Sequence, residues 1–149
     1  MKIENKTIKF ATKKALDFID FTEEVEKFIN ESGVKGGIIN IQILHTSAAL
    51  IVNENEPLLI EDFKKNIEAS ALSSENYQHD NLAKRNVNVC ENECINGHSH
   101  CKAIHLLVSV TLNIIDKKLQ LGQWQRVFLV ELDRPRKRKI QLQAMGNEY

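Results

Sequence analysis

The sequence predicts an α+β protein whose strands are largely antiparallel. Segments with strand character lie on both sides of two or three helical segments, without a regular strand–helix alternation. Several strand-like segments follow one another in the second half, where Asp116-Lys117 sits at the position of a tight hairpin turn. A chain of 149 residues, 42% hydrophobic and 27% charged, suits one globular domain spanning residues 1–149.

The N-terminal part predicts a strand and then a helix. Apolar and polar residues alternate over residues 7–12, which is typical of a half-buried strand. Thr22 and the two acids after it predict a helix start, with the Thr22 hydroxyl capping free backbone N–H groups. Gly33 is suited to end that helix.

The next segments predict two strands and a second helix. The β-branched run at residues 38–44 is typical of an interior strand, and it delivers His45 at its end. Residues 48–52 then predict a returning strand. Pro57 suits the first turn of a helix over residues 58–67.

The remaining segments predict a polar loop, a short helix and four strands. The loop covers residues 76–96, where functional groups often concentrate, and the helix covers residues 100–107. The four strands are expected at residues 108–115, 118–121, 125–132 and 139–145.

His45, His79 and His100 stand in polar runs that a simple core would not require. Neutral imidazole is the commonest metal ligand and is suited to proton transfer near neutral pH. We expect the three rings to meet around one small polar cavity. A single histidine is more often a surface or core residue, and that interpretation is preferred for His105, which lies among apolar residues. His100 is expected to point inward, with His98 either outside the site or behind the residues that contact a ligand.

Other polar residues have two interpretations each. Glu54 and Glu56 share one face if their segment is extended and could share a proton or a cation, but such pairs are usually solvated. Trp124 is suited to stack on a ring-shaped ligand, with Gln125 supplying hydrogen bonds, but it is also suited to be a packing anchor.

Cysteines and basic residues form two further clusters. Cys90, Cys94 and Cys101 lie around two histidines at a spacing that could hold tetrahedral zinc, or they are incidental residues of a loop and helix. An odd number of cysteines fits a reducing compartment. The basic run at residues 134–139 could grip phosphates, although its proline favours a turn.

Overall charge and hydropathy exclude several classes of protein. Basic and acidic residues balance at 20 each, which argues against a nucleic-acid surface. Apolar runs are shorter than the ~18 residues that span a bilayer. Residues 1–6 lack the apolar core of a signal peptide, so we expect a cytoplasmic protein.

In order along the chain, these motifs resemble the YjbQ-like family, also called UPF0047 and described as secondary thiamine-phosphate synthases. The resemblance covers residues 38–146. Its motifs are His45-Thr46-Ser47-Ala48-Ala49-Leu50, Asn53-Glu54-Asn55-Glu56, Asp62, Tyr77-x-His79, Asn96-x-x-x-His100, Leu121-Gly122-x-Trp124-Gln125 and Glu131-x-Asp133-x-Pro135-Arg136.

The resemblance implies an antiparallel β-sandwich with flanking helices, assembled as a homotrimer. It implies a transferase that joins a pyrimidine pyrophosphate to a thiazole phosphate and releases pyrophosphate. It also implies that His45, His79 and His100 bind a divalent metal, zinc or magnesium, and act in catalysis with Glu54. The implied contacts to a small phosphorylated metabolite are Asn53, Asp62, Ser109, Trp124, Gln125 and Arg136.

Two alternatives and three departures accompany the resemblance. A metal-dependent hydrolase of phosphorylated metabolites would use the three histidines and Glu54 as base, and a trimeric binding protein would not catalyse at all. Arg134 stands before Pro135 where the family usually has glycine, Gln123 replaces a threonine, and Leu107 replaces a glycine common before the Ser109 position. We expect the last two changes to affect substrate choice.

Overall fold

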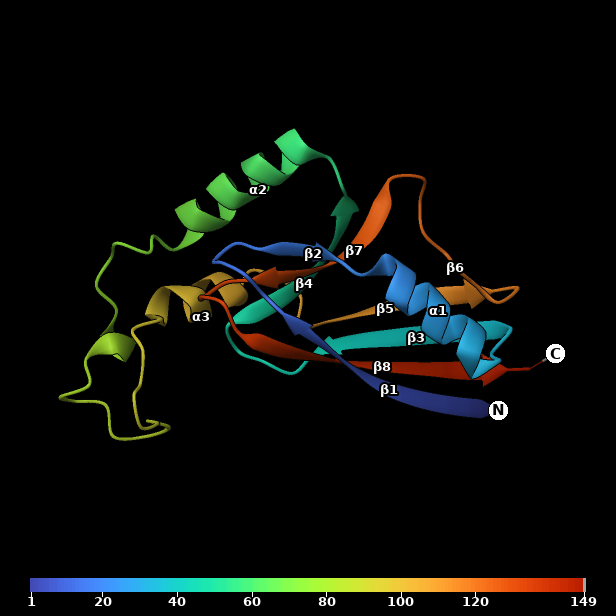
Figure 1. Cartoon of the computed structure of the whole chain (residues 1–149), viewed down its shortest axis with the longest axis horizontal. Coiled ribbons are helices and arrows are strands. Elements are labelled where there is room, and N and C mark those ends of the chain that lie inside the picture. The colour runs from blue at the N-terminus through green and yellow to red at the C-terminus, as the bar shows by residue number, and fades with distance from the viewer. Residues whose placement is uncertain (149) are drawn as a thin grey trace.

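The computed structural model describes residues 1–148, in which every sheet pairing is antiparallel. The first sheet has the strand order β1-β8-β3-β5-β6 and the second has the order β2-β7-β4 (Figure 1). The strands are β1 (Lys2–Ala11), β2 (Phe18–Asp20), β3 (Gly36–Ile43), β4 (Ala48–Glu54), β5 (Ser109–Ile115), β6 (Lys118–Leu119), β7 (Gln125–Glu131) and β8 (Lys137–Asn147). The helices are α1 (Thr22–Ser32), α2 (Pro57–Ser70), the 3-10 turn η1 (Gln78–Asp80) and α3 (Gly97–Ala103).

The main core lies between the two sheets and is closed by α1. Ile39 and Ile41 of β3 and Leu142 of β8 are fully buried there, together with Val127 and Leu129 of β7. Helix α1 adds an apolar stripe made of Val25, Phe28 and Ile29. In β8 and in residues 7–10 of β1, the alternation of apolar and polar residues therefore matches one face on the core and one facing outward.

The second sheet is covered on both faces. On the side away from the first sheet, Phe128, Val130 and Leu132 pack with Ile67 of α2 and with the end of α3 (Figure 1). This explains why the middle of β7 is continuously apolar, since neither face meets water. The predicted α+β, antiparallel fold class is confirmed.

The start of α1 corrects one prediction. The Thr22 side chain does not cap the helix; its hydroxyl donates to Asp20 Oδ1 at 2.7 Å and accepts from the Val127 N–H at 2.8 Å. The Thr22 hydroxyl thereby links the helix to β7. Gly33 ends the helix as predicted, with a left-handed φ of 73°.

Three strand and helix predictions also need correction. The segment at 48–52 is not paired with the preceding strand, because β4 crosses to the second sheet and pairs with β7. The short helix begins at Gly97 and ends at Ala103, three to four residues before the predicted span. The edge strand β2 was not predicted, since three residues give no usable period.

The predicted hairpin between β5 and β6 is confirmed. Asp116 and Lys117 both have positive φ, 52° and 63°, as the tight turn requires. β6 is shorter than predicted and pairs only with Ile114 and Ile115. No helix within residues 1–148 is long and apolar enough to cross a membrane.

Candidate functional site

His79 and His100 lie side by side. His79 belongs to η1 and His100 to α3, and their ring centroids are 4.6 Å apart with an interplanar angle of 57°. Burial lowers the pKa of His100, and the neighbouring His79 lowers it further. His100 is therefore neutral near pH 7 and able to accept a proton. The Nε2 atom of His79 is buried without a hydrogen-bond partner.

A carboxylate and a glycine hold these two rings together. Asp80, which follows His79, accepts hydrogen bonds from the backbone N–H groups of Asn96 and Gly97 at 3.1 and 2.9 Å. These are free N–H groups at the start of α3. A Cβ atom at Gly97 would lie 2.4 Å from the Tyr77 Cβ, so no larger residue fits there. The close packing of η1 on α3 fixes the imidazole pair.

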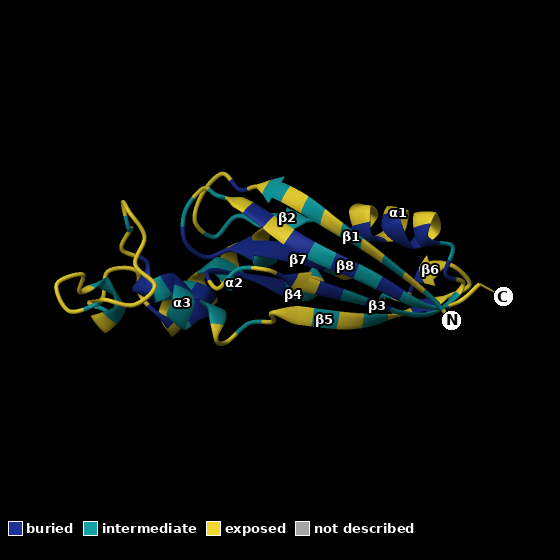
Figure 2. Cartoon of the chain, turned by 90° about the horizontal axis from the view of Figure 1, so that it is seen from below, coloured by how far each residue is buried: buried dark blue, intermediate teal, exposed yellow. Residues whose placement is uncertain are grey.

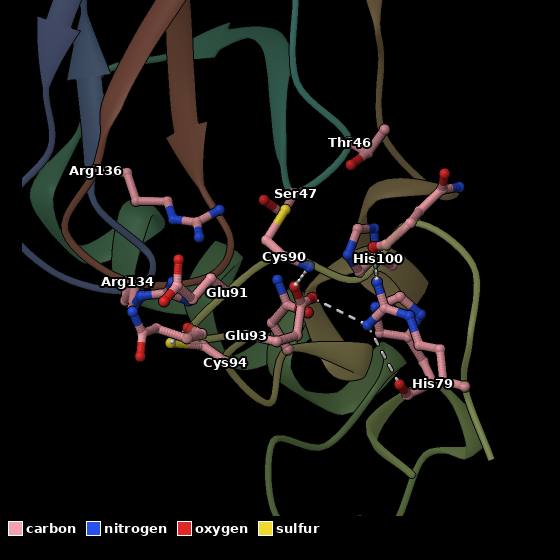
Figure 3. A pocket seen from close by; sticks show the side chains of 14 residues that line it. Thr46, Ser47, His79, Cys90, Glu91, Glu93, Cys94, His100, Arg134 and Arg136 are labelled. Carbon is pink, nitrogen blue, oxygen red and sulfur yellow. Dashed lines mark hydrogen bonds and ion pairs between the residues drawn. The ribbon is translucent and has the colours of Figure 1, made fainter. Parts of the chain in front are cut away.

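Both rings line a cavity of about 460 Å³, which we call the polar chamber. Figure 3 shows the two arginines near one end and the two imidazoles near the other. The chamber is lined by Thr46, Ser47, His79, Arg85, Asn88, Cys90, Glu91, Asn92, Glu93, Cys94, Asn96, His100, Arg134 and Arg136.

Asp133 brings two guanidinium groups together at the chamber. The Asp133 carboxylate is buried and lies 2.8 Å from Arg134 Nη1 and 3.5 Å from Arg136 Nη1. It also accepts from Asn96 Nδ2 at 3.3 Å. One negative charge thus faces two positive ones, and each guanidinium carries five N–H donors. Glu91 and Glu93 also line the chamber and Arg85 pairs with Glu93, so its charges balance, and it is the remaining N–H donors of Arg134 and Arg136 that suit a bound anion.

A buried ion pair anchors the turn at residues 44–47, which forms another side of the chamber. Arg138 and Glu131 are 1% and 0% exposed and pair through Arg138 Nε and Glu131 Oε2 at 2.7 Å. Arg138 Nη2 also donates to the Ser47 carbonyl and hydroxyl, both at 3.1 Å. Glu131 accepts further from Thr12 at 2.9 Å. The basic run at residues 134–139 is therefore not simply a solvated turn, because Arg138 is buried in the core.

The outer wall of the chamber, residues 81–95, is mostly exposed (Figure 2). Arg85 organises it by pairing with Glu93 at 3.0 Å and donating to the Asn88 carbonyl at 2.6 Å. Cys90 and Cys94 are free and exposed on this segment. Within residues 1–148 no three His, Cys, Asp or Glu side chains are grouped to hold a metal ion, so the cysteine zinc site is not formed.

His45 lies outside the polar chamber but close to it. Its Nε2 accepts a hydrogen bond from the Lys139 N–H at 2.8 Å. Burial lowers the His45 pKa, and the Arg138 charge lowers it further. His45 and His100 share a second cavity of about 290 Å³, which we call the apolar slot. The slot is lined by His45, Thr46, Ala48, His100, Ala103, Ile104, Leu107 and Val108.

The remaining predicted contacts gather elsewhere. Asn53, Glu54, Trp124 and Gln125 line a third pocket of about 410 Å³ at the far end of β4. Ala48, at the near end of that strand, lines the slot, so the two sites are roughly 20 Å apart at ~3.3 Å per residue. Within one chain, Trp124 and Glu54 do not reach a ligand held in the polar chamber.

Three other acidic or polar residues that the sequence singled out lie away from the polar chamber. Glu56 does not pair with Glu54; its carboxylate caps α2 by accepting from the N–H groups of Leu58 and Leu59. Asp62 is exposed on α2 and lies 3.5 Å from Lys65. Ser109 lies on the outward face of β5, opposite Gln42 of β3.

Residues 98–102 contain a second buried charge that the sequence did not indicate. Lys102 is 1% exposed and its ammonium lies 2.6 Å from Glu68 of α2, 2.9 Å from Ser73 and 3.2 Å from His98 Nδ1. This cluster joins α3 to α2. It also places His98 on the opposite side of the helix from His100, as expected for residues two apart in a helix.

Comparison with known proteins now identifies the family. The family model described as UPF0047 protein YjbQ-like matches residues 6–147. The chain belongs to the YjbQ-like UPF0047 family. It is 31% identical to a UPF0047 protein of Methanothermobacter thermautotrophicus over 98% of this chain and 94% of that protein. It is 30% identical to the UPF0047 protein YugU of Bacillus subtilis over 95% of this chain and 98% of that protein.

Solved structures of YjbQ-like proteins share the fold. A YbjQ-like protein of unknown function from Sulfolobus solfataricus superposes with a TM-score of 0.87 at 31% identity, covering 98% of this chain and 99% of that one. A hypothetical protein from Aeropyrum pernix gives a TM-score of 0.85 at 30% identity, covering 97% and 99%. The likeness establishes the YjbQ-like architecture.

Proposed function

We propose that this YjbQ-like chain binds a phosphorylated metabolite in the polar chamber and acts as a secondary thiamine-phosphate synthase. In that reaction the thiazole nitrogen attacks the methylene carbon of the pyrimidine pyrophosphate. The carbon–oxygen bond to pyrophosphate breaks, and pyrophosphate leaves with the bonding electrons. The observation that carries the proposal is the Arg134–Asp133–Arg136 arrangement facing the imidazole pair.

The arginines supply what the leaving group needs. Negative charge develops on the pyrophosphate oxygens as the bond breaks, and preorganised positive charge is often the largest catalytic contribution. Asp133 holds both guanidiniums in place before substrate arrives, so little reorganisation is needed. The Ser47 hydroxyl, fixed by Arg138, adds a further polar group on the same cavity.

The imidazole pair supplies proton transfer. His100 is neutral near pH 7 because burial lowers its pKa, so it is able to accept a proton from a substrate group. A divalent metal would lie on His79 and His100 in this proposal. Two imidazoles are fewer than the three protein ligands of a typical catalytic zinc site, and His45 lines a different cavity. The residues of one chain therefore fit a metal only in part, and no step is assigned to it.

We also propose that the chain assembles as a homotrimer through the outward face of the first sheet. Two rows of that face carry neutral amides and hydroxyls in register across four strands, with hydrogen bonds such as Gln143 Nε2 to Asn5 Oδ1 at 2.9 Å, and the charged pair Lys9 and Lys139 forms the row beside them. Depletion of charge is typical of interface cores. The rows are Asn5-Gln143-Asn40-Thr111 and Thr7-Gln141-Gln42-Ser109. Light scattering of wild type and of Gln143→Lys tests this, since an unchanged monomer in both would contradict it.

Single-turnover assays test the proposed reaction. Purified protein is mixed with the pyrimidine pyrophosphate and the thiazole phosphate, and thiamine phosphate is quantified against an Arg134→Gln, Arg136→Gln variant and a His100→Ala variant. We expect product from wild type and a loss of at least about 100-fold in each variant. Asn81→Ala, an exposed change outside the chamber, is the matched control.

Two other results would assign a different function. Tight binding of either substrate without turnover would support a metabolite-binding protein and reject the synthase. Hydrolysis of phosphate esters that is lost with a chelator would support a metal-dependent hydrolase. The hydrolase also requires Glu54 as base, and Glu54 lies at the far end of β4 from the chamber.

A further inference from the structure

The apolar slot borders the polar chamber directly. Thr46 and His100 line both cavities, so the two spaces adjoin at these residues. The slot begins where the chamber ends, at the imidazole of His100. Cavities of about 460 and 290 Å³ suit a metabolite-sized ligand that occupies both.

The slot differs from the chamber in chemistry. Ile104 is 79% exposed and Val108 is 60% exposed, and both line the slot. Leu107 is half-exposed and is held in place by backbone hydrogen bonds to Leu50 of β4. Ile104, Leu107 and Val108 together form an apolar patch at the surface. Such patches usually contact a ligand or partner.

We propose that the slot binds the ring of a phosphate ester whose anionic head occupies the polar chamber. This rests on the proposed phosphate binding and adds the position of the ring: the flat ring, joined to the phosphate or pyrophosphate through a short linker, lies in the slot. The Arg134–Arg136 pair holds the head, and Ile104, Leu107 and Val108 cover the ring. The linker then lies beside Thr46 and His100, at the boundary of the two cavities.

The position of the slot beside the two arginines favours a small anionic ligand over a second copy of the chain. A second copy of the chain would cover the slot without using the two arginines held by Asp133 in the adjoining cavity. A ligand with an anionic end and an apolar end matches both cavities at once. The Trp124 pocket is roughly 20 Å away and is not needed for this ligand.

Isothermal titration with two matched esters tests the inference. Methyl phosphate probes the head alone, and benzyl phosphate adds a ring on a one-carbon linker. We expect benzyl phosphate to bind at least about tenfold more tightly to wild type, since burial of a ring of this size has that effect or more. Ile104→Ser and Val108→Ser should each reduce the ratio toward one and leave methyl phosphate binding unchanged. Ile115→Ser, half-exposed at the far end of β5, should change neither.

The outcomes separate this inference from the proposed function. Equal affinity for the two esters in wild type overturns the slot assignment and leaves phosphate binding intact. A slot variant that changes the oligomeric state but keeps the affinity ratio also overturns it, because the patch is then an interface between copies. Failure of both esters to bind rejects the phosphate chamber and the slot together. Preference for benzyl phosphate without thiamine-phosphate formation rejects the synthase and supports the slot.

Discussion

Two sides of the polar chamber are held in different ways. The turn at residues 44–47 is anchored by Arg138 and Glu131, both removed from water, whereas the outer wall at residues 81–95 depends on Arg85 and Glu93, which are each 15% exposed. A buried charge that loses its partner is costly, but a partly exposed one can be rehydrated. We therefore expect the first side to hold its shape more firmly than the outer wall.

The largest expected effect comes from breaking the firmer side. Arg138→Met leaves the Glu131 carboxylate buried without its guanidinium partner. We expect the free energy of unfolding to fall by about 3–5 kcal/mol, measured by urea denaturation. The double variant Arg138→Met, Glu131→Leu should be less destabilised than the single variant, because no charge is then left unpaired. A single variant as stable as wild type would contradict the assigned role.

The next effect comes from separating η1 and α3. Gly97→Ala places a methyl group 2.4 Å from the Tyr77 Cβ, so the two segments must move apart. We expect a loss of about 1–3 kcal/mol in unfolding free energy together with reduced phosphate binding. Gly122→Ala is the control, since the nearest atom there is the flexible Gln125 side-chain oxygen at 3.3 Å. Equal behaviour of the two variants would argue against the close packing.

A smaller effect is expected from loosening the outer wall. Arg85→Ala removes a partly exposed ion pair and should lower global stability by no more than about 1 kcal/mol. It should still raise the rate of proteolysis within residues 81–95 and the rate of thiol labelling at Cys90 and Cys94. Labelling of the half-buried Cys101 is the internal reference. Unchanged cleavage and labelling would show that the wall does not depend on Arg85.

The smallest effect is a pH dependence. Burial lowers the His45 pKa in the folded protein below its ordinary value of 6.5, so unfolding takes up a proton in mildly acidic solution. Stability is therefore fully present above the unfolded pKa and is lost as pH falls through it toward the folded value. His45→Gln should reduce this slope, and His105→Gln at an exposed position should not. Equal slopes in all three proteins would contradict the assignment.

The sequence predicted elements with a clear period and missed those set by distant contacts. The hairpin at Asp116-Lys117 and the alternating strands follow from local chemistry, so they could be recognised. The start of α3 could not, because Asp80 caps it from sixteen residues away. The predicted helix was therefore displaced toward the C-terminus.

The sequence also predicted only some of the residues that form the polar chamber. His79 and His100 do meet, whereas Glu54 and Trp124, which the resemblance grouped with them, lie at the far end of β4. Arg138 and Lys102 are the clearest omissions, since each stands among other charged or polar residues that resemble a solvated surface. Only the three-dimensional pairing with Glu131 or Glu68 distinguishes a core cation from its exposed neighbours.

The hydrogen bond from the Lys139 amide to His45 selects one tautomer of that ring. Because Nε2 acts as the acceptor, the single proton of the neutral imidazole resides on Nδ1. His45 consequently presents a donor, not a lone pair, to anything that enters beside it. A ligand oxygen at this position is favoured over a cation, and nitrogen-15 chemical shifts of the labelled ring would report the assignment directly.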